Sequence, residues 1–270
     1  MILEQPTILN APNKKPILID ISYAGEKTGK PLVIFCHGYK GFKDWGAWHL
    51  VAQQFAKAGF CFVKFNFSHN GGTPEIPIDF PDLEAFANNN FTTELDDLDR
   101  VLNFLNASEV SLIGHSRGAG IVLIKAEEDS RIQKVITWAG VSDFKARFQM
   151  DSEAFAEWKK TGITHIENAR TKQQLPHHWQ FFEDFITNED RLTIKRAVRS
   201  LNKPQLIVHG SADPTVTMAE AKAIQSWNAN SQLEIIEGGD HVFGAKHPWK
   251  ESELPEDLRK VVDITVSFLG

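Results

Sequence analysis

From residue 31 onward, the hydrophobic pattern alternates between two kinds of segment. Short apolar runs without alternation, such as Leu32–Cys36 (LVIFC) and residues 60–67 (FCFVKFNF), are typical of strands covered on both faces. Longer segments between them carry apolar residues at helical spacing, as in residues 91–106. This order predicts an α/β fold with a mostly parallel central sheet and helices on both faces.

The remaining elements follow from the same two patterns. Residues 17–23 (ILIDISY) alternate apolar and polar positions, which predicts an antiparallel edge strand with one face in water. In the helix predicted over residues 91–106, Glu94, Asp96, Asp97 and Asp99 lie in the first turns, where carboxylates complement the helix dipole. We expect these carboxylates to form a solvated face. Further strands are predicted at residues 110–113, 134–139, 205–208 and 233–236, and further helices at 48–58, 119–126, 218–227 and 258–269.

Residues 144–200 interrupt this alternation, because they are rich in charge and carry no strand signal. We interpret them as a helical cap inserted over the site, within a single domain that spans residues 1–270. The alternative is a set of ordinary surface helices whose aromatic side chains pack on the sheet. These aromatic residues fall at roughly helical intervals: Phe144, Phe148, Phe155, Trp158, Trp179, Phe181, Phe182 and Phe185.

Residues 109–126 (EVSLIGHSRGAGIVLIKA) have the order strand, tight turn, helix. The GHSRG pentapeptide places Ser116 in the turn. A serine at that point adopts a strained backbone conformation, and glycines two residues away leave room for it. Its hydroxyl would then be presented at the edge of the sheet. The alternative is a serine that caps a helix entered from a strand.

Two further residues suited to the same chemistry also follow predicted strands. Asp213 and His241 each lie just beyond a strand end, and the carboxyl ends of parallel strands meet at one edge of a sheet. A histidine can accept the Ser116 proton and return it to a leaving group, while a carboxylate orients the imidazole. Asp143, after the strand at residues 134–139, and Asp240, beside His241, are alternative acids.

The GHSRG turn, together with the chain order Ser, Asp, His, resembles the α/β-hydrolase family from about residue 31 to the C-terminus. The nearest branches are the cinnamoyl-esterase, dienelactone-hydrolase and serine-aminopeptidase-like enzymes. The resemblance implies an α/β-hydrolase fold with a catalytic triad of Ser116, His241 and Asp213. It also implies an oxyanion hole made by the backbone N–H groups of Tyr39 and Arg117. Taken alone, the glycine-rich segment around Tyr39 is an ordinary turn between strand and helix.

The substrate pocket is expected beside these loops. His37 and His115 flank the site and are expected to orient loops there. Trp179, Phe181 or Phe182 of the cap is expected to stack on an aryl group. Because the cap is rich in Phe and Trp and the net charge is negative, the pocket should favour small, uncharged or aromatic acyl groups over anionic or very long ones.

One turn departs from the family pattern. After the strand at residues 60–67, many members carry Gly-x-Gly-x-Ser, whereas this chain has Ser-His-Asn-Gly-Gly. The contribution of His69 and Asn70 is therefore left open.

These residues predict a serine esterase that cleaves small-molecule carboxylic esters through an acyl-enzyme. An amide or peptide hydrolase of the same fold is an alternative, because fold does not decide which bond is cleaved. The alternative from another class is a non-catalytic protein of this fold that binds a ligand in the same pocket.

Composition excludes some classes of binding partner. A formal net charge of −6 with scattered Lys and Arg argues against a nucleic-acid partner. The N-terminus lacks a secretory signal pattern and no run of about 18 apolar residues occurs, so we expect a cytoplasmic protein without a membrane span. The ten histidines show no metal-ligand spacing, so neither a metal nor a cofactor is expected. Cys36 and Cys61 are expected to be reduced core thiols. The oligomeric state and the natural substrate do not follow from the sequence.

Overall fold

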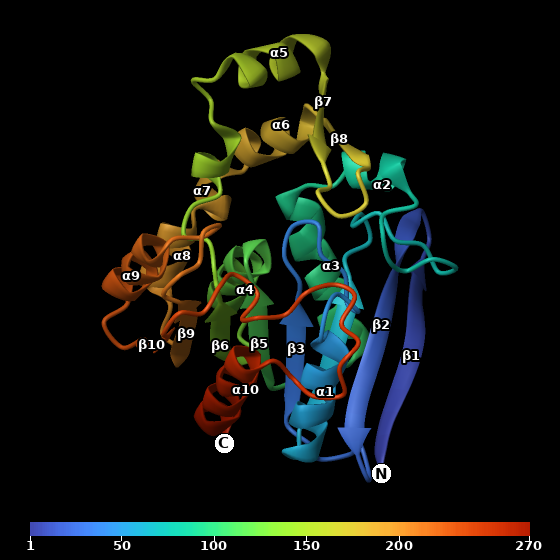
Figure 1. The fold of residues 1–270 in the computed structure, drawn as a ribbon, viewed down its shortest axis with the longest axis vertical. Coiled ribbons are helices and arrows are strands. Elements are labelled where there is room, and N and C mark those ends of the chain that lie inside the picture. Colours follow the sequence, from blue (N-terminus) through green and yellow to red (C-terminus); the bar gives the residue numbers. More distant parts are fainter.

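An eight-stranded sheet runs through the protein in the order β1-β2-β4-β3-β5-β6-β9-β10 (Figure 1). The computed structural model describes residues 1–270. Only β2 runs antiparallel to its neighbours β1 and β4, and all other pairs are parallel. This architecture confirms the predicted α/β fold class. The strands are β1 (Ile2–Ala11), β2 (Lys14–Ala24), β3 (Leu32–Cys36), β4 (Cys61–Asn66), β5 (Val110–His115), β6 (Ile132–Trp138), β9 (Gln205–Gly210) and β10 (Gln232–Ile236).

Strand β2 is not the edge strand that its alternating pattern predicts. Strand β1, which the sequence pattern missed, pairs with β2 along most of its length and forms the edge instead. The polar residues of its alternating segment, Asp20 and Ser22, are also buried. Asp20 forms ion pairs with Lys43 and Lys64, which compensate its buried charge. Alternation here reflects a buried ion cluster and not a face in water.

The helices form two layers, one on each face of the sheet. Helices α1 and α10 pack on one face against Phe35 and Trp138, and α3, α4, α8 and α9 cover the other face. Each layer buries a separate apolar core, which explains why the central strands lack alternation. The helices are α1 (Trp48–Lys57), α2 (Leu83–Ala87), α3 (Phe91–Phe104), α4 (Arg117–Glu128), α5 (Glu153–Thr161), α6 (Gln180–Thr187), α7 (Glu189–Leu192), α8 (Ile194–Ser200), α9 (Met218–Trp227) and α10 (Glu256–Leu269), with a 3-10 turn at Lys145–Phe148.

The predicted cap segment stands above the end of the sheet to which the β3 arrow points (Figure 1). Two features of that prediction are corrected. The segment contains an antiparallel hairpin of β7 (Ile163–Glu167) and β8 (Gln174–His178). Most side chains of β7 are exposed, so no hydrophobic period marked it. Helix α8 belongs to the layer on the sheet, because Ile194 packs against Gly120 of α4, where an added Cβ would lie 2.7 Å from Ile194 Cδ1.

The carboxylates of α3 do not form the solvated face that was predicted. Glu94 and Asp97 are each 2% exposed, whereas Asp96 is exposed and Asp99 is half-buried. Burial raises the pKa of Asp97 to about 6, although hydrogen bonds from Ser68 oppose that shift. The Asp97 carboxylate accepts the Ser68 N–H at 2.7 Å and so fixes the turn after β4.

Two smaller observations complete the fold. Cys36 and Cys61 are free, buried thiols on neighbouring strands. In the register of those strands Leu32 pairs with Cys61, so the two sulfurs lie toward opposite ends of the pair. None of the helices has the length and apolar composition needed to cross a membrane.

Candidate active site

Ser116 occupies the tight turn between β5 and α4 with φ 55° and ψ −119°. Such a backbone conformation is strained for a residue with a side chain. The flanking glycines are required sterically, because a Cβ on Gly118 would lie 2.5 Å from the Cys36 carbonyl oxygen and one on Gly114 would lie 2.4 Å from the Gly118 carbonyl oxygen. The Ser116 side chain makes no cap hydrogen bond to α4, so it is not a helix cap.

His241 joins the two other residues expected at this edge. Its Nε2 lies 3.0 Å from Ser116 Oγ and its Nδ1 lies 2.7 Å from Asp213 Oδ2. The other carboxylate oxygen of Asp213 accepts the N–H groups of Thr215 and Val216 at 2.8 and 2.9 Å. Burial raises the pKa of Asp213, but the hydrogen bonds from His241 and these N–H groups outweigh burial and hold the pKa below its usual value. The carboxylate is therefore ionised at neutral pH.

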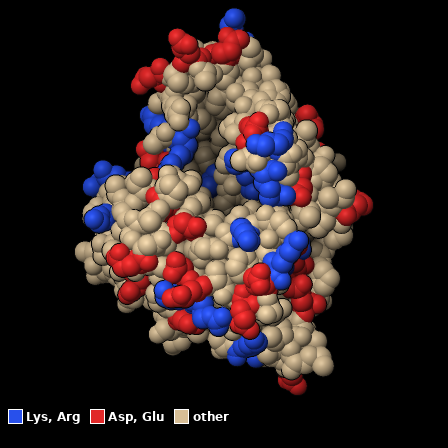
Figure 2. All heavy atoms as spheres, viewed as in Figure 1, with Lys and Arg blue, Asp and Glu red and all other residues tan.

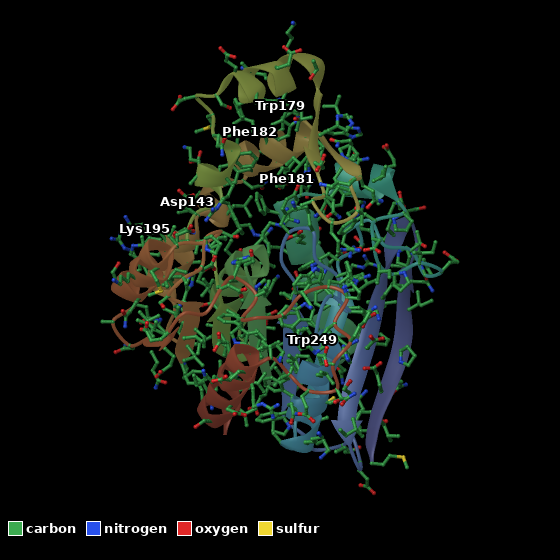
Figure 3. The ribbon with its side chains drawn as sticks, in the orientation of Figure 1. Asp143, Trp179, Phe181, Phe182, Lys195 and Trp249 are labelled. Atoms are coloured by element: carbon green, nitrogen blue, oxygen red, sulfur yellow. The ribbon has the colours of Figure 1, made fainter.

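The two alternative acids are engaged elsewhere. Asp143 accepts the Lys145 N–H at 2.7 Å and lies near the base of the cap (Figure 3). Asp240 is exposed and accepts the N–H groups of Val242 and Gly244, so it shapes the loop that carries His241. Neither carboxylate forms a hydrogen bond with the His241 ring.

His115 and His37 each form a hydrogen bond to a backbone carbonyl of a loop around the site. His115 Nε2 donates to the His241 carbonyl at 2.9 Å, and His37 Nδ1 donates to the Gly38 carbonyl at 2.9 Å. Burial lowers the pKa of His115 to about 3, with a further contribution from His241. Burial also lowers the pKa of His37 to about 4. Both rings are therefore neutral near pH 7 and act as hydrogen-bonding braces.

Two backbone N–H groups beside Ser116 have no partner in the protein. The Tyr39 N–H donates to no acceptor, and the Arg117 N–H opens helix α4, where N–H groups lack an intrahelical partner. The loop after β3 passes directly against the serine, since a Cβ on Gly38 would lie 2.8 Å from Ser116 Cβ. The geometry therefore leaves two donors free next to the hydroxyl.

The unusual turn after β4 supports that loop. Asn70 Nδ2 donates to the Gly41 carbonyl at 3.3 Å and Asn70 Oδ1 accepts the Gly72 N–H at 2.9 Å. His69 instead hydrogen-bonds Ser68, with 2.7 Å between Nδ1 and Oγ. Asn70 is thus a brace for the Tyr39 loop.

Comparison with known proteins agrees with this geometry. The family model for the alpha/beta hydrolase fold matches residues 31–196. The chain belongs to this family.

A curated relative, 2-hydroxymuconate semialdehyde hydrolase from Pseudomonas sp. (strain CF600), is 25% identical over 278 residues, covering 91% of this chain and 92% of the relative. The serine hydrolase BPHL of Mus musculus is 25% identical over 186 residues, covering 66% of this chain and 64% of the relative. The solved structure of Est1E from Butyrivibrio proteoclasticus with ferulic acid bound has a TM-score of 0.74 at 16% identity and covers 97% of each chain. At that identity the likeness concerns the fold.

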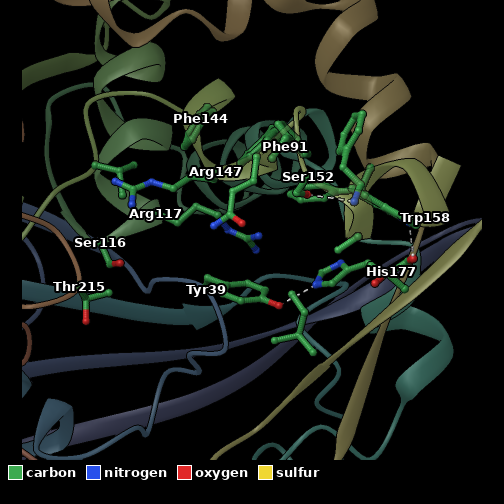
Figure 4. Close-up of a pocket in the computed structure, with 18 of the residues that line it drawn as sticks. Tyr39, Phe91, Ser116, Arg117, Phe144, Arg147, Ser152, Trp158, His177 and Thr215 are labelled. Atoms are coloured by element: carbon green, nitrogen blue, oxygen red, sulfur yellow. Dashed lines mark hydrogen bonds between the residues drawn. The ribbon is translucent and has the colours of Figure 1, made fainter.

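In this α/β hydrolase a cavity of about 520 Å³ lies between Ser116 and the cap (Figure 4). The expectation that Trp179 and Phe182 line it is corrected, because Phe181 takes that place. Trp179 and Phe182 pack on each other and on Phe155, with ring centroids 4.8 to 5.2 Å apart. Figure 3 shows Phe181 nearer the sheet than these two. The aromatic lining consists of Tyr39, Phe91, Phe144, Phe148, Phe155, Trp158 and Phe181.

A polar group in this cavity was missed by the sequence analysis. The Arg117 guanidinium lies 4.9 Å from the Tyr39 ring centroid and forms an ion pair with Glu94. The Tyr39 hydroxyl is 2.7 Å from His177 Nε2 (Figure 4). Burial, followed by the Arg117 charge, lowers the pKa of His177 to about 3. No local pattern signals these pairs, because their partners lie 23 and 138 residues apart.

A second cavity of about 290 Å³ borders Ser116 and also His241. Lys40 from the loop after β3 and Asn168 and Arg170 from the β7–β8 turn contribute polar groups to its wall. The molecular surface is deeply hollowed below the cap, and Lys and Arg atoms lie on both sides of the hollow (Figure 2). No cluster of three or more His, Cys, Asp or Glu side chains is arranged to hold a metal ion.

Proposed function

We propose that this hydrolase cleaves carboxylic esters through Ser116, His241 and Asp213 by way of an acyl-enzyme. The observation that carries the proposal is the hydrogen-bonded series from Asp213 to His241 to Ser116, which ends on a hydroxyl held in a strained turn. A serine hydroxyl needs an adjacent base to become nucleophilic at neutral pH, and His241 Nε2 lies within reach of it.

The reaction runs in two balanced steps. Ser116 Oγ bonds to the ester carbonyl carbon as His241 accepts the hydroxyl proton. The bond from that carbon to the leaving oxygen then breaks, and His241 passes the proton to the departing alcohol. Water repeats the sequence on the acyl-enzyme and releases the carboxylic acid. Asp213 holds the imidazole with Nδ1–H toward its carboxylate and stabilises the imidazolium.

The N–H groups of Tyr39 and Arg117 are proposed to bind the oxyanion of each tetrahedral intermediate. Their freedom from acceptors within the protein supports this role. Loss of one such donor typically costs about a hundredfold or more in rate.

The larger cavity is proposed to hold a small, uncharged or aromatic acyl group. Its aromatic lining supports that choice. The two arginines that line it are already paired with carboxylates, so they do not call for an anionic acyl group. Arg117 pairs with Glu94, and Arg147 pairs with Glu220. The ferulic acid bound to Est1E in the related fold is an aromatic acid of this kind.

A fluorophosphonate probe and a panel of aryl and alkyl esters test the proposal together. Wild-type protein should be labelled and should hydrolyse esters, whereas Ser116→Ala should lose both. Ser142→Ala is the matched control, because Ser142 follows the neighbouring strand β6 and contacts Glu220 instead of His241. Equal labelling of wild type and Ser116→Ala would refute the assignment. Faster turnover of an anilide than of the matched ester would move the proposal to amide bonds.

A further inference from the structure

The two cavities meet at Ser116 but differ in which catalytic residue they reach. The larger cavity borders Ser116 and Arg117 but not His241, whereas the smaller one borders both Ser116 and His241. In the proposed reaction His241 Nε2 must deliver a proton to the leaving oxygen. The leaving group therefore occupies the smaller cavity, and the acyl group occupies the larger one.

We propose that the leaving alcohol carries an anionic group, a carboxylate or a phosphate, which Lys40 binds in the smaller cavity. This inference rests on the proposed esterase function and adds the chemical class of its leaving group.

Lys40 is a cation without a carboxylate partner. Its ammonium group forms no ion pair or hydrogen bond. Lys40 Nζ lies over the face of the Tyr39 ring, 5.5 Å from the ring centroid. Partial burial lowers the pKa of Lys40, and no nearby carboxylate offsets that effect. A half-buried charge of this kind gains more from an incoming anion than a fully hydrated one does.

The rest of the smaller cavity's wall is compatible with an anion. The residues that line it include no Asp or Glu, although the chain has more acidic than basic side chains. Arg170 faces the same space, and its charge is already paired with Asp79. Lys40 therefore supplies the uncompensated charge.

Asn168, which also lines the smaller cavity, adds a hydrogen-bond donor. It is 9% exposed, and its Oδ1 accepts the Arg170 N–H at 3.2 Å, which orients the amide so that Nδ2 is the free donor. No protein group accepts from Nδ2, so a bound oxygen would meet a donor there. Asn168 comes from the β7–β8 hairpin and Lys40 from the loop after β3, so the two side chains reach the cavity from different parts of the fold.

The two cavities thus differ in charge balance. Both arginines of the larger cavity are matched by Glu94 and Glu220. In the smaller cavity Lys40 is unmatched. A substrate with a neutral acyl group in the larger cavity and an anionic leaving group in the smaller cavity matches the charge of each.

Matched esters test this directly. Phenylacetyl esters of meta-hydroxybenzoate and meta-hydroxybenzamide share the acyl group and differ in the charge of the leaving group. Each kcat/KM is divided by the rate of hydroxide-catalysed hydrolysis to remove intrinsic reactivity. The wild-type ratio of carboxylate to amide ester should be about ten, as expected for one charge-assisted contact, and should fall with added salt. A phenylacetyl ester of meta-hydroxyphenyl phosphate shows which anion is preferred, and preference for either supports the inference.

Three variants separate the contact from other effects. Lys40→Met should bring the ratio close to one, and Lys40→Arg should retain most of it. Lys172→Met is the matched control, because Lys172 is a lysine of the β7–β8 turn that does not line the cavity, is 70% exposed and pairs with Glu167. The control should keep the wild-type ratio.

A wild-type ratio of one or less overturns the inference. A ratio that Lys40→Met leaves unchanged also overturns it, even if both esters slow equally. That result would mean that Lys40 supports the shape of its loop and does not bind the anionic group. The proposed function is judged separately by the labelling of Ser116. An absence of turnover with every ester overturns the proposed function, and this inference falls with it.

Discussion

Glu94 on α3 and Arg117, the residue directly after Ser116, form a buried ion pair at the larger cavity, which Arg117 lines. Their side chains are 2% and 13% exposed, so water screens the pair poorly. Asn89 Nδ2 donates to the same Glu94 oxygen at 2.8 Å, so this oxygen accepts from two side chains. The guanidinium charge of Arg117, which lines the larger cavity, is thereby balanced by the Glu94 carboxylate.

Glu94→Gln should leave the Arg117 charge uncompensated. We expect the free energy of unfolding to fall by about 3 kcal/mol, the usual scale for breaking a buried pair. Hydrolysis of an ester with an anionic acyl group, such as a hemisuccinate, should rise several-fold relative to the matched neutral ester. Chemical denaturation and the ratio of kcat/KM values measure these effects. Asp96→Asn on the exposed face of the same helix should change neither quantity.

Asp213→Asn should lower kcat by about ten-thousandfold, because the amide favours the wrong imidazole tautomer at His241. Asp143→Asn should stay within about twofold of wild type, since Asp143 contacts the Lys145 backbone instead of His241. Steady-state kinetics on one aryl ester compares the two variants. A larger loss in Asp143→Asn than in Asp213→Asn would place the triad acid after β6.

Phe181→Ala should reduce the preference for aryl over alkyl acyl groups, because Phe181 lines the acyl cavity and stacks on His177 with ring centroids 5.4 Å apart. Trp179→Ala should instead lower stability by about 3 kcal/mol with little change in that preference, since Trp179 packs within the cap on Phe155 and Trp158. The ester panel and melting temperatures of both variants decide the matter. A selectivity change confined to Trp179→Ala would contradict the assignment of the cavity wall.

His115→Gln should make the protein less sensitive to acid. In the folded state the pKa of His115 is lowered to about 3, so the unfolded chain takes up a proton near pH 6.5 that the native ring refuses. The stability that His115 contributes is therefore complete above pH 6.5 and is lost as the pH falls. Between pH 7 and pH 5 wild type should lose about 2 kcal/mol more than the variant, measured by urea unfolding at both pH values. A glutamine can still donate to the His241 carbonyl. Parallel pH curves would therefore mean that His115 takes up its proton as readily in the native state as in the unfolded chain, which would contradict the lowered pKa.

Much of the architecture followed from local patterns in the chain. Runs such as Leu32–Cys36 bury both faces, and such burial requires a continuous apolar sequence, so the central strands could be predicted from the sequence. The steric demands of the turn at Ser116 are likewise local, because they involve glycines two residues away. Residues at parallel strand ends share one edge, which is why Asp213 and His241 could be expected near Ser116 before any coordinates were known.

Only the tertiary structure decided which charges are buried and which side chains face the substrate. In the sequence Asp20 and Glu94 resemble surface carboxylates. In the structure Lys64 and Arg117, which come from other elements, form ion pairs with them. Hydrophobic periodicity cannot predict such ion pairs, because their partners are distant in the sequence. Phe181 lies in α6 and Trp179 is the residue that caps it, but their spacing in the sequence does not say which of the two faces the cavity. Lys40 and the β7–β8 turn line one cavity because of how the hairpin folds over the sheet, and these segments lie more than a hundred residues apart in the sequence.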